Sequence, residues 1–436
     1  MRMVLVLVGL SLACAPATSS VDLAIVHVTT VDVERGRVHP DQTILVSGDR
    51  IVGILPAGEA EVPATADVLD GTDLFAIPGL WDMHVHALWD TTVAANFLAA
   101  FARHGITGVR DMGGDMEVLG WVRSIEASER TPWPRIVAAG SILDGPEPVS
   151  PDISVAVSNP EDGTRAVQDL VSAGADFIKV YTLLPRDAFF AILEAATALG
   201  VPVVGHVPGS VSVREAVEAG QIGIEHLRDE LGAFCTPGAE AACDSLIQTF
   251  STLSVSNTPT LVVLEAKGIP GYQSPEDRET DIPVPDLVRA LWQDSRRSHS
   301  ERPETYFDGR KEIFEREMNL VARIDDAGAP LLAGSDAGNP FIFPGPGLHR
   351  ELELLVLAGL TPRAALATAT TAAARFLGVS DSIGVLCNGC VADIVLLRGN
   401  PLERISSIRQ IAGVVLRGEV LDFGVQQPPT KATRAR

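Results

Sequence analysis

The spacing of hydrophobic and polar positions divides the chain into two similar ends and a different centre. In residues 21–70 and again in 392–418, short segments alternate apolar and polar residues and are broken by Gly, Asp and Pro. A period of two is typical of half-buried β-strands. In the centre, apolar strand-like runs alternate with helical stretches, which stop at a glycine just before the next run.

The centre holds eight strand candidates, the number of strands in a (β/α)8 barrel. They lie near residues 80–86, 106–112, 135–140, 177–181, 202–207, 222–227, 254–263 and 330–336. We therefore expect an α/β fold, with a TIM-barrel catalytic domain over 76–383 and a small β-sandwich domain built from both chain ends, 21–75 and 384–426. About 70 residues separate the last two candidates, and we interpret polar, proline-rich 265–308 as a lid. The alternative is a surface excursion that contacts no substrate.

Composition and charge narrow the class of partner. With 46% hydrophobic and 21% charged residues among 436, the chain is a packed globular protein. Its formal net charge is −22, and its Lys/Arg-rich stretch is short, at 431–436. The electrostatic footprint of a nucleic-acid-binding protein is therefore missing from the sequence. We expect a small-molecule substrate and no nucleic-acid partner.

The N-terminus has the features of an export signal. A positively charged start precedes an apolar run over 4–13, which is shorter than the roughly 20 residues of a membrane-spanning helix. Cleavage after the small residues at 15–17 would remove a signal peptide, 1–17. Alternatively, Cys14 and the residues before it resemble a bacterial lipobox, so that 1–13 would be a lipoprotein signal and lipidated Cys14 a membrane anchor. Both alternatives predict a periplasmic or secreted protein.

Four further cysteines form two pairs along the sequence. Cys235 and Cys243 flank a turn-rich loop, and an oxidising compartment would allow them to form a disulfide. Cys387 and Cys390 form a CxxC motif, which is compatible with a structural turn or with a metal or redox site.

Histidines end three of the predicted barrel strands. His84 and His86 share one face of the first strand because side chains alternate with a period of two. His206 and His226 each end a later apolar strand. Each could instead be a core histidine that fills a barrel layer. However, unpaired polar groups inside a barrel are costly, and a metal ion is the simplest common partner for all four.

Lys179 and Asp336 add the remaining chemistry. Lys179 lies in an apolar strand-like run, and a lysine cation cannot bind a metal ion. If its amine reacts with carbon dioxide, the carbamate is an anion whose two oxygens can bridge two metals. The alternative is a barrel lysine paired with Asp336 or a glutamate. Asp336 ends the eighth strand candidate, where it could bind metal and accept a proton, or cap a helix.

Together these motifs resemble the amidohydrolase superfamily, within it the branch of metal-dependent Xaa-Pro and Xaa-Arg dipeptidases and imidazolonepropionase. The resemblance covers residues 21–423 and rests on segments 78–86, 177–181, 205–207, 224–226, 334–336 and 389–397. It implies two divalent metal ions, usually zinc, and it also predicts the β-sandwich. The implied ligands are His84, His86 and Asp336 for the first ion, His206 and His226 for the second, and N6-carboxylated Lys179 as the bridge between them.

The resemblance also implies a mechanism, in which a hydroxide between the metals attacks the scissile carbonyl and Asp336 passes the proton to the leaving nitrogen. Tyr181 shares a strand face with Lys179 and would hydrogen-bond the tetrahedral oxyanion. Arg110 and Arg228 are candidates for binding a substrate carboxylate, with ordinary ion pairs as the alternative. His349 is a further candidate near the substrate.

The favoured hypothesis is a binuclear metal-dependent amidohydrolase that cleaves amide C–N bonds of dipeptides, N-acyl amino acids or cyclic amides. Dipeptidase-like members often carry a histidine in a Gly-Gly-His stretch after the third strand, and residues 139–146 contain none. An ester, lactone or carbamate hydrolase would use the same site. A mononuclear aminohydrolase (deaminase) would leave Lys179 unexplained. A non-catalytic exported binding protein would be expected to have lost metal ligands.

Overall fold

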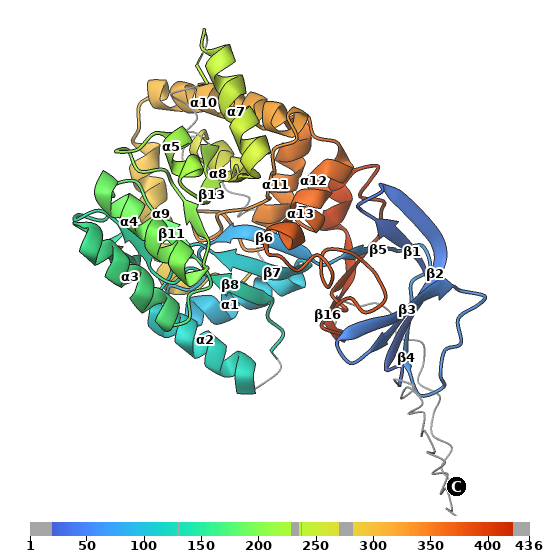
Figure 1. The fold of residues 1–436 in the computed structure, drawn as a ribbon. Helices are drawn as coiled ribbons and strands as arrows, with labels where there is room; N and C mark the ends of the chain where they lie inside the picture. Colours follow the sequence, from blue (N-terminus) through green and yellow to red (C-terminus); the bar gives the residue numbers. More distant parts are fainter. Residues whose placement is uncertain (1–19, 129–130, 228–234, 237, 270–281, 422–436) are drawn as a thin grey trace, which may run out of the picture.

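The computed structural model describes residues 20–128, 131–227, 235–236, 238–269 and 282–421. A larger α/β part lies beside a smaller β-sheet part in Figure 1. The signal segments 1–17 and 1–13, with Cys14, lie outside the described residues. Among the helices that are described, none is both long and apolar enough to cross a membrane.

The smaller part is an eight-stranded sheet to which both ends of the chain contribute. Its order is β17-β16-β15-β5-β1-β2-β3, with β4 also paired to β1. The strands are β1 Leu23–Asp32, β2 Arg37–Ser47, β3 Arg50–Pro56, β4 Asp67–Asp70, β5 Phe75–Pro78, β15 Ile394–Leu397, β16 Ile411–Leu416 and β17 Glu419–Leu421. Antiparallel pairing of β15 with β5 joins the two ends. They form one hydrogen-bonded sheet with its own core, and the two packed layers of a sandwich stay a prediction.

The larger part contains two parallel sheets. One has the order β6-β7-β8 and the other β10-β9-β11-β12-β13-β14. The strands are β6 Leu80–Val85, β7 Ile106–Asp111, β8 Arg135–Ala138, β9 Ile142–Asp144, β10 Ser154–Ala156, β11 Ile178–Val180, β12 Val203–Gly205, β13 Gln221–Glu225 and β14 Ser256–Thr258. Most of their residues are buried, as expected for parallel strands that helices cover, and β10 is the exception with no buried residue.

Helices surround these sheets (Figure 1). They are α1 Thr91–Arg103, α2 Met116–Ser128, α3 Pro160–Ser172, α4 Arg186–Leu199, α5 Val213–Glu218, α7 Glu240–Leu253, α8 Leu261–Lys267, α9 Asp286–Ser300, α10 Glu304–Asp326, α11 Pro346–Leu357, α12 Pro362–Thr368 and α13 Thr371–Phe376. Local signals set their ends. The Asn159 side chain caps α3, Ser212 and Glu215 form a capping box on α5, and Gly200 in the left-handed region ends α4.

Two sequence expectations need correction. The predicted strand over 254–263 contains only β14, because Pro259 and left-handed Thr260 (φ +50°) end the strand and α8 begins at Leu261. The eighth candidate, 330–336, is an irregular extended segment rather than a named strand. It still hydrogen-bonds to both neighbours, since Met83 N–H donates to Ala333 O (2.9 Å) and Leu332 N–H donates to Asn257 O (2.9 Å).

Candidate metal centre

The six residues predicted as metal ligands come from ends of neighbouring parallel strands. His84 lies in β6, Lys179 in β11, and His206 and His226 directly follow β12 and β13. Asp336 ends the segment beside β6. Parallel strands place their carboxyl ends on one side of the fold, which is where α/β enzymes build their sites. The strand positions therefore gather these side chains without any long-range loop.

Their distances are those of a cluster that could share ions. Asp336 Oδ1 lies 3.5 Å from Nε2 of both His84 and His86, and Asp336 Oδ2 lies 3.8 Å from Nε2 of His226. The ring centre of His226 is 4.7 Å from that of His84 and 5.1 Å from that of His206. His84, His86 and Asp336 could hold a metal ion as one group.

A protein oxygen near Nδ1 orients each of the four imidazoles. His84 Nδ1 is 2.8 Å from Glu225 Oε2, and His86 Nδ1 is 2.9 Å from Gly113 O. The other two pairs are His206 Nδ1 with Thr182 Oγ1 at 3.0 Å and His226 Nδ1 with Thr260 Oγ1 at 2.6 Å. Such partners fix the ring and leave Nε2 for a metal.

Two buried atoms of the cluster point to an ion. His84 Nε2 and Asp336 Oδ1 have no hydrogen-bond partner among the described residues, and both residues are at least 96% buried. Leaving such groups unpaired in a protein interior costs several kcal/mol, roughly 2–7 for a neutral polar group. Imidazole nitrogen and carboxylate oxygen are ligands of zinc and similar divalent metals. The donor set therefore fits a divalent metal ion.

Backbone geometry at the site is unusual. His226 (φ +61°), Thr260 (φ +50°) and Asp336 (φ +58°) occupy the left-handed region, which costs non-glycine residues about 1–3 kcal/mol each. Gly334 is required for close approach, because a Cβ atom there would lie 2.6 Å from Cβ of His84. Strain of this kind persists where the surrounding packing holds it, and here it aims two candidate ligands into the cluster.

Burial tunes the ionisation of the cluster. It lowers the pKa of His84 and of His226 well below the usual value, and neighbouring cationic groups lower each further. Burial raises the pKa of Asp336 to about 7, although Lys267 and Lys179 act in the opposite direction. The imidazoles of His84 and His226 are therefore neutral, which is the form that binds metal.

Arg110 takes a role different from the one the sequence predicted. Its side chain is 1% exposed and lies beneath the cluster, where Nη2 donates to Glu225 Oε1 (2.6 Å) and Nε donates to Met83 O (2.6 Å). Its guanidinium also lies over the rings of Phe177 and Phe376. The predicted contact with a substrate carboxylate is therefore corrected. Arg110 lies inside strand β7 rather than after it, so it points inward below the site.

The two remaining substrate-binding candidates are His349 and Arg228. His349 lies in α11, 2% exposed, with Nε2 2.9 Å from His104 O, and burial lowers its pKa to about 3. It is held between two helices and is absent from the lining of the cluster's cavity, which corrects that prediction. Arg228 lies outside the described residues.

The cluster opens into a cavity of about 310 Å³. Its charged or reactive lining beyond the candidate ligands consists of Tyr181 and Lys267, and Tyr181 stacks on His206 with ring centres 4.0 Å apart. The apolar wall is formed by Trp89, Ile142, Ile153, Val263, Leu264 and Pro340. Lys267 is not among the predicted site residues, because the sequence predicts a strand over 254–263 and a lid over 265–308. Its spacing of four from Val263 on α8 is the signal that could have placed both on one face.

The predicted lid segment is only partly described. Residues 265–267 end α8 at the cavity, and 270–281 lie outside the described residues. Trp292 of α9 donates from Nε1 to Gly338 O (3.3 Å), and its ring packs near Phe341 and Phe343. This part of the segment thus packs on the loop that follows Asp336. Whether it closes over a substrate stays a prediction.

Both cysteine pairs are bonded in the structure. Cys235 is joined to Cys243, with their Cα atoms 4.8 Å apart, and Cys387 is joined to Cys390. The second bond closes a turn beside β3, where Ile51 N–H donates to Cys390 O (2.9 Å). A bonded pair fits a structural turn and equally the oxidised form of a redox CxxC motif, so these two alternatives stay open.

Comparison with known proteins decides the family. The amidohydrolase family model matches residues 75–421. The chain belongs to the amidohydrolase family. It is accordingly a hydrolase that acts on carbon–nitrogen bonds.

Solved amidohydrolases share its fold over most of both chains. A protein from Bifidobacterium longum provisionally identified as a prolidase is 25% identical, covers 92% of this chain and 95% of its own, and has a TM-score of 0.72. Bottromycin amidohydrolase is also 25% identical, with 92% and 86% covered and a TM-score of 0.73. A Xaa-Pro dipeptidase with methionine bound in its active site is 21% identical, with 92% and 99% covered and a TM-score of 0.71.

A curated relative matches a shorter part. Adenine deaminase from Chelativorans sp. (strain BNC1) is 27% identical over 197 residues, which is 43% of this chain and 32% of that protein. The matched segment therefore spans about a third of that relative's length.

Proposed function

We propose that this chain is a binuclear metal-dependent amidohydrolase that cleaves amide C–N bonds of small substrates, namely dipeptides, N-acyl amino acids or cyclic amides. The observation that carries the proposal is the cluster itself, in which four histidines with fixed Nδ1 atoms surround Asp336 and Lys179 at one end of the parallel strands.

We also propose that the two parallel sheets form one closed (β/α)8 barrel. Segment 330–337 hydrogen-bonds to β6 and β14 on one side. At the other junction, Asp176 N–H, just before β11, donates to Ala138 O of β8 (2.9 Å). These contacts support closure at both junctions, with the helices outside.

The proposed metal ligands follow the two halves of the cluster. His84, His86 and Asp336 would hold one ion, His206 and His226 the second, and carboxylated Lys179 both. Zinc is the expected metal, since it takes imidazole and carboxylate ligands. When bound, two such ions supply Lewis acidity at the scissile carbonyl and lower the pKa of a water molecule. Lys179 is 1% exposed, and its amine would gain carbon dioxide and release a proton to form the carbamate.

Asp336 is the proposed proton carrier. Its Oδ1 atom is buried without a hydrogen-bond partner among the described residues, and its Oδ2 atom lies 3.8 Å from Nε2 of His226. A carboxylate in this position could accept a proton from the attacking water and then donate it to the leaving nitrogen. Tyr181, on the cavity wall next to His206, is the proposed hydrogen-bond donor to the developing oxyanion.

The cavity supports a substrate with one apolar side chain and one carboxylate. Apolar side chains of 263 and 264 and Trp89 form its wall, and Lys267 adds a positive charge. A dipeptide or an N-acyl amino acid carries such a carboxylate next to the scissile amide. The neighbouring Xaa-Pro dipeptidase with bound methionine is in keeping with this class. We further propose that the protein is exported.

Metal content and turnover test the proposal together. Plasma mass spectrometry of the mature protein should find two divalent ions per chain, and Lys179→Ala should retain one or none. The parent should hydrolyse members of a panel of dipeptides and N-acyl amino acids. One metal ion, unchanged in Lys179→Ala, would contradict the bridging role.

Deamination is the second candidate, and the match to adenine deaminase favours it. The same panel should therefore include aminopurines and aminopyrimidines, with ammonia release as the readout. Ammonia release without peptide or acyl hydrolysis, from a protein with one metal ion, would replace the amidohydrolase proposal with a deaminase.

A further inference from the structure

A second and larger cavity lies at the opposite ends of the barrel strands. It measures about 870 Å³, and its lining includes Ile136, Phe177 and Pro202, which stand at the amino ends of β8, β11 and β12. The other wall comes from the β-sheet part, with Arg50 at the start of β3 and Arg417 in the turn between β16 and β17. The cavity therefore lies between the two parts of the molecule, a common place for small-molecule sites.

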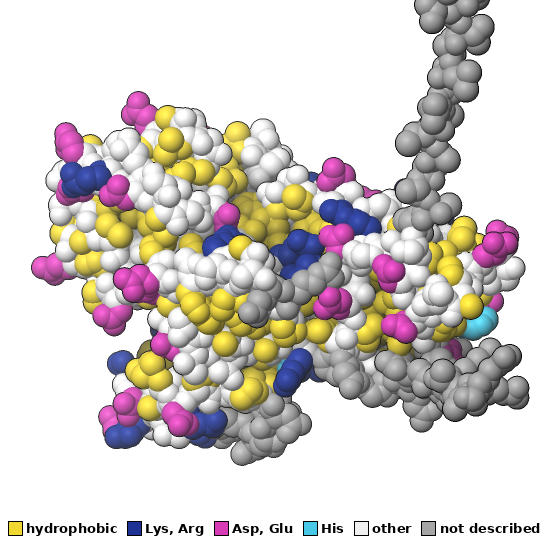
Figure 2. All heavy atoms as spheres, turned by 90° about the horizontal axis from the view of Figure 1, so that it is seen from below, with side chains coloured by type: hydrophobic (Ala, Val, Ile, Leu, Met, Phe, Trp, Pro, Cys, Tyr) yellow, Lys and Arg dark blue, Asp and Glu magenta, His cyan; other side chains and the backbone are white. Residues whose placement is uncertain are grey.

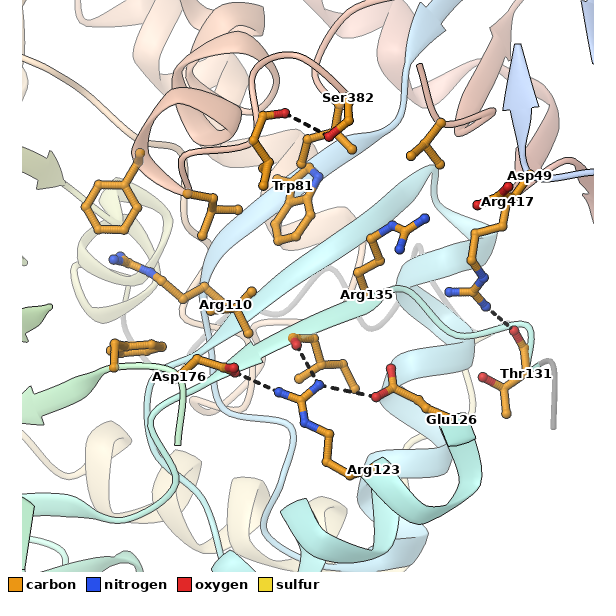
Figure 3. Close-up of a pocket in the computed structure, with 18 of the residues that line it drawn as sticks. Asp49, Trp81, Arg110, Arg123, Glu126, Thr131, Arg135, Asp176, Ser382 and Arg417 are labelled. Atoms are coloured by element: carbon orange, nitrogen blue, oxygen red, sulfur yellow. Dashed lines mark hydrogen bonds and ion pairs between the residues drawn. The ribbon is translucent and has the colours of Figure 1, made fainter. Parts of the chain in front are cut away.

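Arginines are concentrated in this cavity although the chain carries a net charge of −22. Its lining contains Arg50, Arg110, Arg123, Arg135 and Arg417. Figure 2 shows Lys and Arg side chains beside exposed hydrophobic atoms in a hollow between the larger and smaller parts. Figure 3 shows Arg110, Arg123, Arg135 and Arg417 around the cavity.

Most of these guanidinium groups are already matched by protein carboxylates. Arg123 lies 2.7 Å from Asp176 and 3.2 Å from Glu126. Arg110 points away from Arg135 in Figure 3, and its Nη2 atom lies 2.6 Å from Glu225 Oε1. These contacts neutralise the inner wall. The outer wall is formed by Arg135 and Arg417, which contact a carboxylate that does not line the cavity, that of Asp393.

Arg135 and Arg417 share one buried carboxylate. Asp393 Oδ1 accepts from the backbone N–H of Arg417 (2.7 Å), and its Oδ2 lies 3.6 Å from Arg135 Nε. Neither Asp393 Oδ2 nor Arg135 Nε has a hydrogen-bond partner among the described residues, and both atoms are buried. Burial lowers the pKa of Arg417, and nearby Arg135 acts in the same direction. The Asp393, Glu126 and Glu419 carboxylates act in the opposite direction. Arg135 Nε is therefore a buried cationic donor without a hydrogen bond among the described residues.

The backbone at Arg417 is also unusual. Arg417 (φ +50°) and Gly418 (φ +81°) both occupy the left-handed region in the hairpin turn. Asn and Gly are the residues that such turns favour, so an arginine there is held at a cost. The turn directs the Arg417 side chain to the cavity, where its Nη2 donates to Thr131 O (2.5 Å).

The rest of the wall is apolar. Trp81, Val137, Phe376, Ile383 and Val391 line it. The volume lies within the range of roughly 300–1,000 Å³ of small-molecule sites, which combine apolar walls with a few polar groups. A carboxylate suits this wall, because guanidinium groups hold it through paired hydrogen bonds while its apolar group meets the apolar side chains.

We propose that this cavity binds a small organic monoanion, a carboxylate carried on an aromatic or branched apolar group. The carboxylate lies on Arg135 and Arg417, and the apolar group packs against Trp81 and Phe376. The site is separate from the metal centre and does not depend on the proposed reaction. Guanidinium groups suit it because they hold carboxylates through paired, charge-assisted hydrogen bonds.

Fluorine NMR on the full chain tests the site, with 4-fluorophenylacetate as the probe and 2-(4-fluorophenyl)ethanol as its neutral counterpart. The carboxylate should bind, and Arg135→Gln and Arg417→Gln should each weaken it by about tenfold. Neither change should affect the alcohol. Arg165→Gln, which alters an exposed ion pair on α3, is the matched control and should leave both probes unchanged.

Further variants separate binding from folding and from the metal centre. His206→Ala should retain the probe, and Val137→Trp, which fills the cavity, should lose it while unfolding at the parent's temperature. If Arg135→Gln does not fold, Arg135→Lys should weaken binding instead. Three results would overturn the site: no binding at about 10 mM probe, equal binding of the alcohol, or loss of binding in His206→Ala but not in the arginine variants.

Discussion

Oε2 of Glu225 lies 2.8 Å from Nδ1 of His84, and both side chains are fully buried beneath the metal centre. The other oxygen of Glu225 lies 2.6 Å from Nη2 of Arg110. One carboxylate thus orients a candidate ligand and neutralises a buried guanidinium. Its negative charge also makes the imidazole of His84 a stronger metal ligand.

Glu225→Gln should therefore weaken metal binding by about 10–100-fold, because the neutral amide supports His84 less well. It should also lower the stability of the metal-free protein, since Arg110 would lose its buried partner. Competition with a chromogenic chelator measures the first effect, and thermal unfolding of the chelated protein measures the second. Glu218→Gln, exposed at the end of α5, is the control. Unaltered metal affinity would show that Glu225 pairs with Arg110 but does not strengthen His84 as a metal ligand.

Tyr181→Phe should lower kcat by about 10²-fold with little change in KM, because an oxyanion donor acts mainly in the transition state. Steady-state kinetics on the best substrate of the panel measures this. Tyr306→Phe, on α10, is the control. Equal turnover in Tyr181→Phe and the parent would remove this hydroxyl from the mechanism.

Lys267→Met should raise KM by about tenfold for an N-acyl amino acid, because the cavity would lose the charge that faces the substrate carboxylate. The corresponding methyl amide should be hydrolysed equally by both proteins. Lys311→Met removes an exposed lysine on α10 and should change neither value. The same KM increase for both substrates would mean that Lys267 supports the structure of the cavity and does not bind the substrate carboxylate.

Glu351 gives a pH-dependent stability that can be separated from the site. Burial raises its pKa to about 8 from 4.5, while Val262 N–H donates to its Oε2 (2.8 Å). Between these values the folded state holds a proton that the unfolded state has lost. This group therefore makes the free energy of unfolding fall as pH rises from 4.5 to about 8.

Glu351→Gln should remove that slope, so its unfolding temperature should exceed the parent's by more at pH 8 than at pH 5. Calorimetry at both values measures the difference. Glu194→Gln, exposed on α4, should shift both temperatures equally. A gain for Glu351→Gln that is the same at the two pH values would contradict a buried, protonated Glu351.

The sequence predicted the parts of the site that depend on strand periodicity. His84 and His86 are two residues apart in β6, and His206 and His226 follow apolar strands, so a parallel α/β fold brings them together. The sheet formed by both ends also followed from alternation. These features depend on local spacing and on the common direction of the strands.

What the sequence did not predict depends on orientation and on single backbone angles. The sequence indicated that Arg110 could bind a substrate carboxylate. A shift of one position along β7 decides whether a side chain lies above the cluster or below it, and Arg110 lies below it. The left-handed backbone of Thr260 turned a predicted strand into α8 and brought Lys267 to the cavity. The partners of the histidines come from distant segments, and no local pattern marks them.

The pairing of β5 with β15 has a consequence for how the protein is made. More than 300 residues separate these neighbouring strands, so the ribosome finishes β5 roughly 15–60 s before β15 exists. Until then, one edge of the first five strands has no partner. The nascent chain should therefore depend on holdase chaperones during synthesis, and truncation near residue 390 should yield insoluble protein even though the metal ligands are all present.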